Sequence, residues 1–525
     1  MLRVVRRLFR PTITRSSLEE RHIIKLEIIG GKNLQVPSQR IPAGVYISIN
    51  IDSKRQWRSS VQALSSEESV VWGDTVTLSS KASRAFSVEI RASYEADRML
   101  GSGEVLGKLQ MWWDELLDHG DEPFVLSFPP VRGVHPSLIL KVAVVHACDN
   151  HNGALSDCLV DCEIARDTDA GHARYAKYVT RKTVAHLNYA VEHFQLVLDQ
   201  CPVSHPDHAM ALTNLAWARL QGYIDNHLQD IAATISLFRD ALALRPQRHP
   251  DYPISLYNLT SALTWRHRKK GTAADICEAA QLYHELLPLC PEGTYLRSIA
   301  AGPNDVDYVI SECNDLPIDA SDEGIHLRRV VLELGPLGHP LRCSAFNNLA
   351  QAVKARFNQR GSIDDLDTSI QLGREVVSLC PEGHAGRASY LNDLVSSLES
   401  RFGHQGKPND LDDIISLHEK LLHLCPVGHT SRGVSLDNLG NALITRFYKR
   451  GDIDDITRAV SLRREALTLH PPGHPSHGTT LKNLTTALKI RYANLPVGED
   501  LDEVMNRYRE SLLLRQHDCT LYNIR

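Results

Sequence analysis

Residues 426–470 read PVGHTSRGVSLDNLGNALITRFYKRGDIDDITRAVSLRREALTLH, and this stretch decides the fold of most of the chain. Its first half places apolar side chains at helical spacing on one face, at Leu436, Leu439, Leu443 and Phe447. Gly451 then interrupts the pattern, and Asp454 and Asp455 fall where acids suit the positive end of a second helix. The stretch predicts a helical hairpin, which must stack on copies of itself to bury its apolar face.

The same unit recurs along the chain. Proline returns at intervals of 44 or 45 residues, at Pro202, Pro246, Pro291, Pro336, Pro381, Pro426 and Pro471. Residues 202–525 are therefore assigned to seven repeats of about 45 residues, preceded by a partial helical repeat over 172–201. Register 291–335 is degenerate, because Gly302 and Pro303 stand where the Asn-Leu core of the first helix belongs. We expect this register to be the weak point of the array.

The second helices resemble those of tetratricopeptide (TPR) repeats. That family places a small residue, a large one four later, a small or aliphatic one three later and proline five later. Three sets fit this pattern: Ala190, Phe194, Val197 and Pro202; Ala279, Tyr283, Leu286 and Pro291; and Ala459, Arg463, Ala466 and Pro471. The 45-residue unit resembles kinesin light chain repeats, and still more the basidiomycete fungal TPR proteins that often continue into a caspase-like CHAT protease domain. The chain stops at Arg525, so we expect no such domain here.

Residues 22–146 show a period near two, punctuated by turn residues, which predicts a β-sandwich. Expected strands are Ile23–Ile29, Val45–Ile51, Val70–Leu78, Phe86–Arg91 and Leu138–Val145. The order of the segments LEIIGGKNL, GVYISIN, VVWGDTVTL and MLGSGEVLG resembles a C2 domain, with Trp72 and Asp74 at matching positions. The predicted fold class is thus an all-β C2-like sandwich followed by an all-α TPR-like superhelical solenoid.

The loops of this domain argue against calcium. Calcium needs six to eight oxygen ligands. The first loop, QVPSQRIPAG, has no acid, and the later loop offers only Glu95 and Asp97. We therefore expect no calcium site and no metal cofactor, and at most a weak, calcium-independent membrane contact.

The totals exclude several classes of protein. Lys and Arg number 58 against 63 Asp and Glu, a net charge of −5, so nucleic acid is not the expected partner. The first 17 residues contain five Arg and no acid, and we assign 1–21 to a basic tail, with mitochondrial targeting as an alternative.

Residues 147–171 lack a clear period and are assigned to a linker. Its scattered Cys and His do not form the paired motif of a structural zinc site. Eleven cysteines with no secretory signal favour the cytoplasm.

Asparagine recurs at one position of the first helix, the helix that lines the groove in TPR proteins. This Asn register comprises Asn214, Asn258, Asn348, Asp393, Asn438 and Asn483. An Asn side chain offers donors and an acceptor, so the register is the candidate partner-binding site for a peptide backbone. The alternative is that these side chains bond within the repeats.

Three further registers have mainly structural interpretations. An Arg register of Arg266, Arg356, Arg401, Arg446 and Arg491 is expected to pair with second-helix acids such as Asp365 or Asp455, or else to form a basic groove for acidic peptides. A His register of His205, His249, His339, His384, His429 and His474 is expected to stabilise turns. The Cys register, Cys201, Cys290, Cys380 and Cys425, is expected to be buried.

These patterns favour a non-enzymatic adaptor that binds a partner protein or peptide in the groove of the solenoid. A Cys-His protease related to the CHAT proteins and a lipid-binding regulator led by the β domain are the alternatives. The last hairpin, through Leu512 and Leu514, lacks a polar capping helix, so self-association there is a further expectation.

Overall fold

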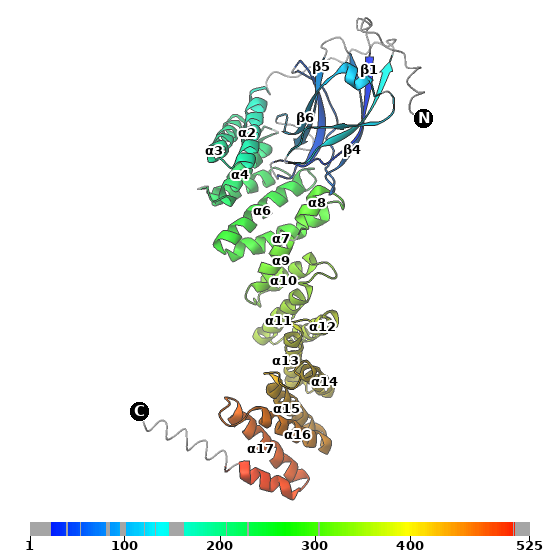
Figure 1. Ribbon diagram of the computed structural model, residues 1–525. Helices are drawn as coiled ribbons and strands as arrows, with labels where there is room; N and C mark the ends of the chain where they lie inside the picture. The colour runs from blue at the N-terminus through cyan, green and yellow to red at the C-terminus, as the bar shows by residue number, and fades with distance from the viewer. Residues whose placement is uncertain are drawn as a thin grey trace, which may run out of the picture. The chain divides into compact units, whose positions relative to one another are not determined.

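The computed structural model describes residues 23–507 and 509 except 38–39, 53, 80–84, 95–100, 120, 132, 146–161, 206, 228–229 and 303–304 (Figure 1). The basic tail, Glu95, Asp97, most of the expected linker and the C-terminal Leu512–Leu514 lie outside the described residues. The chain divides into two units, Met1–Val309 and Ile310–Arg525.

The β domain is a sandwich of two antiparallel four-stranded sheets (Figure 1). One sheet has the order β4 (Val70–Ser79), β1 (Ile23–Lys32), β8 (Ser137–Val145) and β7 (Phe124–Ser127). The other has the order β3 (Lys54–Arg58), β2 (Gly44–Ile51), β5 (Ala85–Ser93) and β6 (Glu104–Trp112), and the short helix α1 (Trp113–Leu117) follows β6. The predicted sandwich is thereby confirmed.

Alternation of side chains explains the core of this domain. Along β1, Ile24, Leu26 and Ile28 are buried, while the residues between them face away from the core. Strands β3, β6 and β7 are absent from the sequence prediction. β3 is a short polar edge strand whose apolar content is Trp57 alone, so it gives little hydrophobic signal.

The helices of the first unit form hairpins that stack in chain order (Figure 1). They are α2 (Cys162–Arg181), α3 (Val184–Gln200), α4 (His208–Ile224), α5 (Ile231–Ala243), α6 (Tyr252–Lys270), α7 (Ala273–Leu289), α8 (Tyr295–Ala300) and α9 (Val306–Asp315), the last crossing into the second unit. α2 begins inside the range expected to be a linker. In the degenerate register the first helix is divided into the short helices α8 and α9.

The second unit continues the same pattern. Its helices are α10 (Asp322–Leu334), α11 (Arg342–Arg360), α12 (Ile363–Leu379), α13 (Arg387–Gln405), α14 (Pro408–Leu424), α15 (Arg432–Arg450), α16 (Ile453–Leu469) and α17 (His477–Asn494), and residues 498–507 are also helical. Apolar side chains from several hairpins share one core, as Leu443, Phe447, Ile456 and Leu484 do. This continuity confirms that the stack, rather than each hairpin alone, buries the apolar faces.

Glycine ends the first helix of most complete hairpins. Gly361, Gly406 and Gly451 have φ of 72°, 63° and 75°, the left-handed conformation of a helix C-cap. A Cβ would strain this conformation, so the Arg-Gly and Gln-Gly steps of the sequence fix where each hairpin turns.

Candidate functional site

The Asn register divides into a buried part and an accessible part. Asn214 and Asn258 are only 1% and 3% exposed. In the second unit, Asn348, Asp393 and Asn483 are half-buried and Asn438 is exposed. The six positions share one place in the repeat, but they do not form one open row.

Asn214 is hydrogen-bonded to a side chain of the β domain. The guanidinium of Arg40 donates from Nη1 to Asn214 Oδ1 at 2.7 Å and lies 4.0 Å from the centre of the Tyr94 ring. Arg40 is 4% exposed, and burial lowers its pKa. Because 174 residues separate the two partners, this contact joins the β domain to α4, the first helix of the seven repeats.

Other contacts hold the β domain against the first unit's helices. The Ser102 amide donates to Asp169 Oδ1 of α2 at 2.6 Å, and Tyr94 stacks on His172 with ring centres 5.2 Å apart. Farther along the chain, the amide of Tyr295 donates to the Leu64 carbonyl at 2.8 Å. The β domain therefore contacts both ends of the first unit's helical array, including the degenerate register.

The second unit presents the rest of the Asn register with different partners. Asn348 Nδ2 donates to the carbonyl of Asn314 at 2.9 Å, a bond between neighbouring repeats. Asp393 Oδ2 accepts from Asn347 Nδ2 at 2.9 Å and from Gln351 Nε2 at 2.7 Å. Among the described residues no bond is recorded for the Asn438 side chain. Asn348 therefore has a structural bond, whereas the side chain of Asn438 faces solvent.

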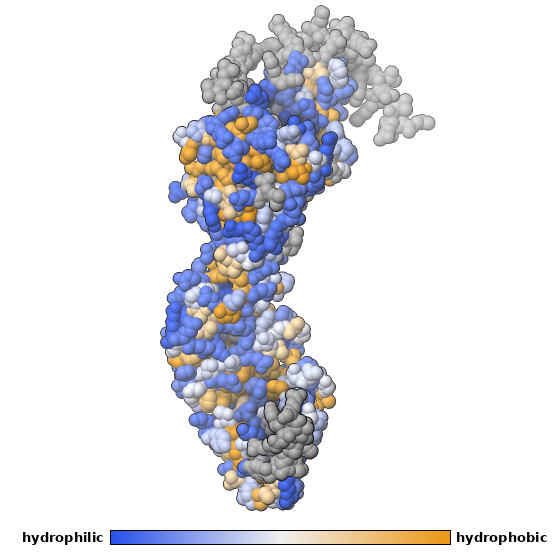
Figure 2. Space-filling model, turned by 90° about the vertical axis from the view of Figure 1, so that its left-hand side faces the viewer, coloured by the Kyte–Doolittle hydropathy of each residue, from blue (hydrophilic) through white to orange (hydrophobic). Residues whose placement is uncertain are grey.

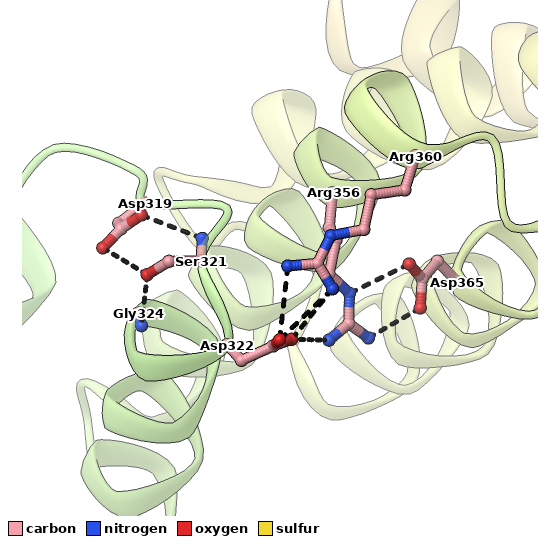
Figure 3. Close-up of polar contacts among 7 residues, drawn as sticks. All are labelled: Asp319, Ser321, Asp322, Gly324, Arg356, Arg360 and Asp365. Carbon is pink, nitrogen blue, oxygen red and sulfur yellow. Dashed lines mark hydrogen bonds and ion pairs between the residues drawn. The ribbon is translucent and has the colours of Figure 1, made fainter.

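The Arg register forms ion pairs with the second helix of its own hairpin (Figure 3). Arg356 donates to Asp365 from Nε at 2.9 Å and from Nη2 at 2.6 Å. The same two hydrogen bonds, from Nε and from Nη2, join Arg266 to Asp275, Arg401 to Asp410, Arg446 to Asp455 and Arg491 to Asp500. The pairing prediction is confirmed, and the alternative of a free basic groove is wrong for these five residues.

In the second unit this pairing also links one hairpin to the preceding one. In Figure 3, Arg356 Nη1 and Arg360 reach Asp322 of α10, with Arg356 at 2.7 Å. Arg401 reaches Asp367 and Arg446 reaches Asp412 in the same way, at 2.8 and 2.9 Å. The hydrogen bonds to Asp455 and then to Asp412 raise the pKa of Arg446, and those from Arg450 and then from Arg446 lower the pKa of Asp412, so the charged forms favour the native stack.

The His register stabilises turns, as predicted. In all six repeats His Nδ1 accepts from the backbone N–H two residues later, as His384 does from Gly386 at 3.1 Å. The acceptor role requires Nδ1 to be unprotonated.

The Cys register is buried, at 1–7% exposure, immediately after the second helices.

Two pockets open in the second unit. The larger, of about 500 Å³, lies between α12, α13 and α14, but its Arg374 is paired with Asp413 and its Arg387 donates to the Val377 and Cys380 carbonyls. The smaller, of about 30 Å³, lies beside Gly373 and is lined by Asn347, Gln351, Lys354, Asp393 and two serines. The sequence pattern does not identify Gly373 or Arg40 as site residues. Gly373 does stand out, because it is the one glycine at a position where the other repeats have a large side chain.

An apolar surface lies over the helices of the first unit. Figure 2 shows apolar residues gathered over α2, α3 and α4. Leu196 of α3 is 49% exposed, and Val203, between α3 and α4, is 71% exposed. Two other features are absent from the described part of the chain: a helix long and apolar enough to span a membrane, and a cluster of three His, Cys, Asp or Glu that could hold a metal ion.

No family model matches this sequence, and no curated protein matches it. Among solved structures, the chain is similar to nearly identical TPR-like repeats of a kinesin light chain from Podosopora anserina, with 15% identity, 44% of this chain and 97% of that chain covered, and a TM-score of 0.28. It is also similar to the human IFIT1 dimer with m7Gppp-AAAA (14% identity, 65% and 71% covered, TM-score 0.25) and to a circular tandem repeat protein (14%, 68% and 86%, TM-score 0.24). At these identities the likeness concerns helical-repeat architecture alone.

The class of the helical region follows from its own geometry: stacked hairpins of about 45 residues make it a TPR-like solenoid. The resemblances of the β domain to C2 domains, and of the repeats to basidiomycete proteins, stay predictions.

Proposed function

We propose that this protein is a non-enzymatic scaffold that binds a partner protein or peptide on the first helices of its second unit. One observation carries the proposal. The Asn register is buried where the β domain contacts the first unit's helices, at Asn214, but reaches the surface at Asp393, Asn438 and Asn483. Polar side chains at equivalent points of successive repeats suit an extended segment better than a compact small molecule.

The chemistry of the accessible register supports a backbone-reading role. Asn438 and Asn483 each carry an amide that can donate and accept at once, so they can bond a peptide N–H and C=O whatever the partner's side chains. Asn348 is less suited to this role, because its amide nitrogen already bonds Asn314. We therefore place the contact surface on α13, α15 and α17.

The test compares two variants of the full chain in quantitative affinity capture. Asn438→Ala together with Asn483→Ala should reduce retention of specifically bound proteins at least tenfold while leaving the melting temperature nearly unchanged. The control is Arg458→Ala, on the second helix α16, where the side chain is 49% exposed. If both variants retain the same proteins to the same extent as the wild type, the proposed surface is wrong.

A further inference from the structure

One buried position of the second helices varies among the repeats. It holds Phe194, Phe238, Tyr283, Arg328, Gly373, His418 and Arg463, spaced by 44 or 45 residues. All seven residues are buried. Arg463 bonds the first helix of its own repeat at Asn441 and that of the next at Asn483, whereas Gly373 has no side chain with which to do so.

The space left by Gly373 is the smaller pocket of the second unit, between α11, α12 and α13. Its volume of about 30 Å³ equals roughly two water molecules by the measure that assigns 10–15 Å³ to each. Gln351, Lys354 and Asp393 are half-buried, so the pocket reaches the surface on the side of the first helices. A ligand group entering from that side would therefore meet a polar lining.

Ninety residues later, an arginine fills the corresponding space. Arg463 is 3% exposed, and its guanidinium donates from Nη2 to Asn441 Oδ1 at 2.5 Å and from Nη1 to the Asn483 carbonyl at 2.7 Å. Asn441 and Asn483 correspond to Gln351 and Asp393 of the pocket. In the repeat of Arg463, these residues bind a guanidinium. In the repeat of Gly373, the corresponding residues are present, but position 373 supplies no guanidinium.

A small residue makes room for that arginine. A Cβ built on Gly440 would lie 3.2 Å from Arg463 Nε and 3.4 Å from its Cγ. The corresponding residue beside the pocket is Ala350. The two repeats therefore differ in a matched way: one pairs Gly440 with Arg463, and the other pairs Ala350 with Gly373.

Arg40 shows that a guanidinium can reach this register from another part of the chain. It comes from the β domain and binds the side chain of Asn214, the Asn-register residue of the first full repeat. Asp393 occupies the same register in its own repeat. Within one molecule, arginines therefore bond Asn-register residues at two places: Arg463 of the preceding hairpin bonds the backbone carbonyl of Asn483, and Arg40 from outside the array bonds the side chain of Asn214.

The pocket offers an acceptor for a hydrogen-bond donor at Asp393. Asp393 accepts its two recorded bonds on Oδ2, so among the described residues Oδ1 has no recorded partner. Lys354 donates to Ser396 at 2.5 Å, and Ser396 is not part of the pocket lining. Ser369 and Ser397 are hydrogen-bonded to each other at 3.2 Å. Asp393 is thus the acceptor that the pocket presents to a ligand.

We propose that the Gly373 pocket binds an arginine side chain of the partner. This inference rests on the proposed scaffold function and names the partner's chemistry. The planar guanidinium carries several donors in a fixed fork and can serve acceptors on both Asp393 and Gln351, which line the pocket, whereas a lysine ammonium offers no such fork.

The test is selection of random twelve-residue peptides displayed on phage against the full chain. Peptides bound by the wild type should be enriched in arginine over the starting library. Gly373→Arg supplies the side chain found in α16 and should abolish that enrichment. Because a Cβ at Gly440 would lie 3.2 Å from Arg463 Nε, the double variant Ala350→Gly with Gly373→Arg, which copies the Gly440–Arg463 pair, makes the matching room and guards against misfolding.

A second measurement uses one selected peptide in fluorescence anisotropy. Replacing its arginine by citrulline, which is neutral and nearly isosteric, should weaken binding at least tenfold, and replacement by lysine should weaken it severalfold. Asp393→Asn, which installs the commoner residue of the register, should reduce wild-type affinity for the arginine peptide to a similar extent.

The outcomes separate the two proposals. Failure to select any peptide would overturn the arginine pocket, whereas the scaffold function is decided by affinity capture with the Asn438–Asn483 double variant. Peptides without arginine enrichment, or arginine peptides bound equally by wild type, Gly373→Arg and Asp393→Asn, would overturn the arginine pocket and leave the scaffold function standing.

Discussion

Replacing Arg446 by Met removes one member of the Arg–Asp pairing while keeping a long apolar stem. The guanidinium bonds Asp455 at 2.9 and 2.7 Å and Asp412 at 2.9 Å. The Asp455 side chain is only 5% exposed, so the variant leaves a buried carboxylate without its cation. We expect the array around α15 and α16 to lose stability.

The expected loss follows from burial. Removing one partner of a buried pair costs about 3–5 kcal/mol because the other charge stays buried. The Arg446 side chain is 22% exposed and Asp412 is 43% exposed, so water offsets part of this cost. We expect about 2–3 kcal/mol for Arg446→Met, and less for the double variant with Asp455→Asn, which no longer buries an unpaired charge.

Native-state hydrogen exchange is the appropriate assay, because repeat arrays open locally rather than in one step. The free energies of opening for amides of α15 and α16 should fall by the stated amount, while those of the β domain stay unchanged. Arg458→Met is the matched control, since Arg458 and Glu419 lie 2.7 Å apart but are 49% and 37% exposed. Such surface pairs contribute about 0.2–1 kcal/mol. Equal effects of the two variants would refute the reasoning.

Three further predictions concern the cores and the domain contact. Burial, with a smaller effect of Arg40, lowers the pKa of His172 from 6.5 to about 3, so the unfolded chain binds the extra proton and stability should fall as pH drops below 6.5. Between pH 7 and pH 5 this proton lowers the free energy of unfolding by about 2 kcal/mol. Urea titrations at the two pH values should show that loss in the wild type but not in His172→Phe, and an unchanged pH dependence in the variant would contradict the prediction. Phe447→Ala, at a site 6% exposed, should cost about 3–5 kcal/mol, measured by exchange in α15, and a loss below about 1 kcal/mol would show that the ring is not core. Arg40→Ala should cost about 1–3 kcal/mol and speed amide exchange in α4 but not in α15, because Asn214 loses its buried partner; unaltered exchange in α4 would count against that bond.

The sequence determined those features whose partners lie close along the chain. The 45-residue period specifies the hairpins, because apolar spacing, left-handed glycines and Pro-x-Gly-His turns all act within one repeat. The Arg–Asp pairing was predictable for the same reason, since nine residues separate Arg446 from Asp455. The His turns are shorter still, with acceptor and donor two residues apart. The short strand β3 escaped prediction because a polar edge strand carries little apolar pattern.

The tertiary structure alone decided which parts of the candidate site are accessible. In sequence, Asn214 and Asn438 are equivalent members of one register. In the folded chain one is buried against Arg40, 174 residues away, and the other faces solvent. Likewise, Gly373 is merely a departure from a repeat pattern until α11, α12 and α13 enclose the space beside it. Sequence periodicity describes what repeats share, whereas access depends on which distant segments pack against each copy.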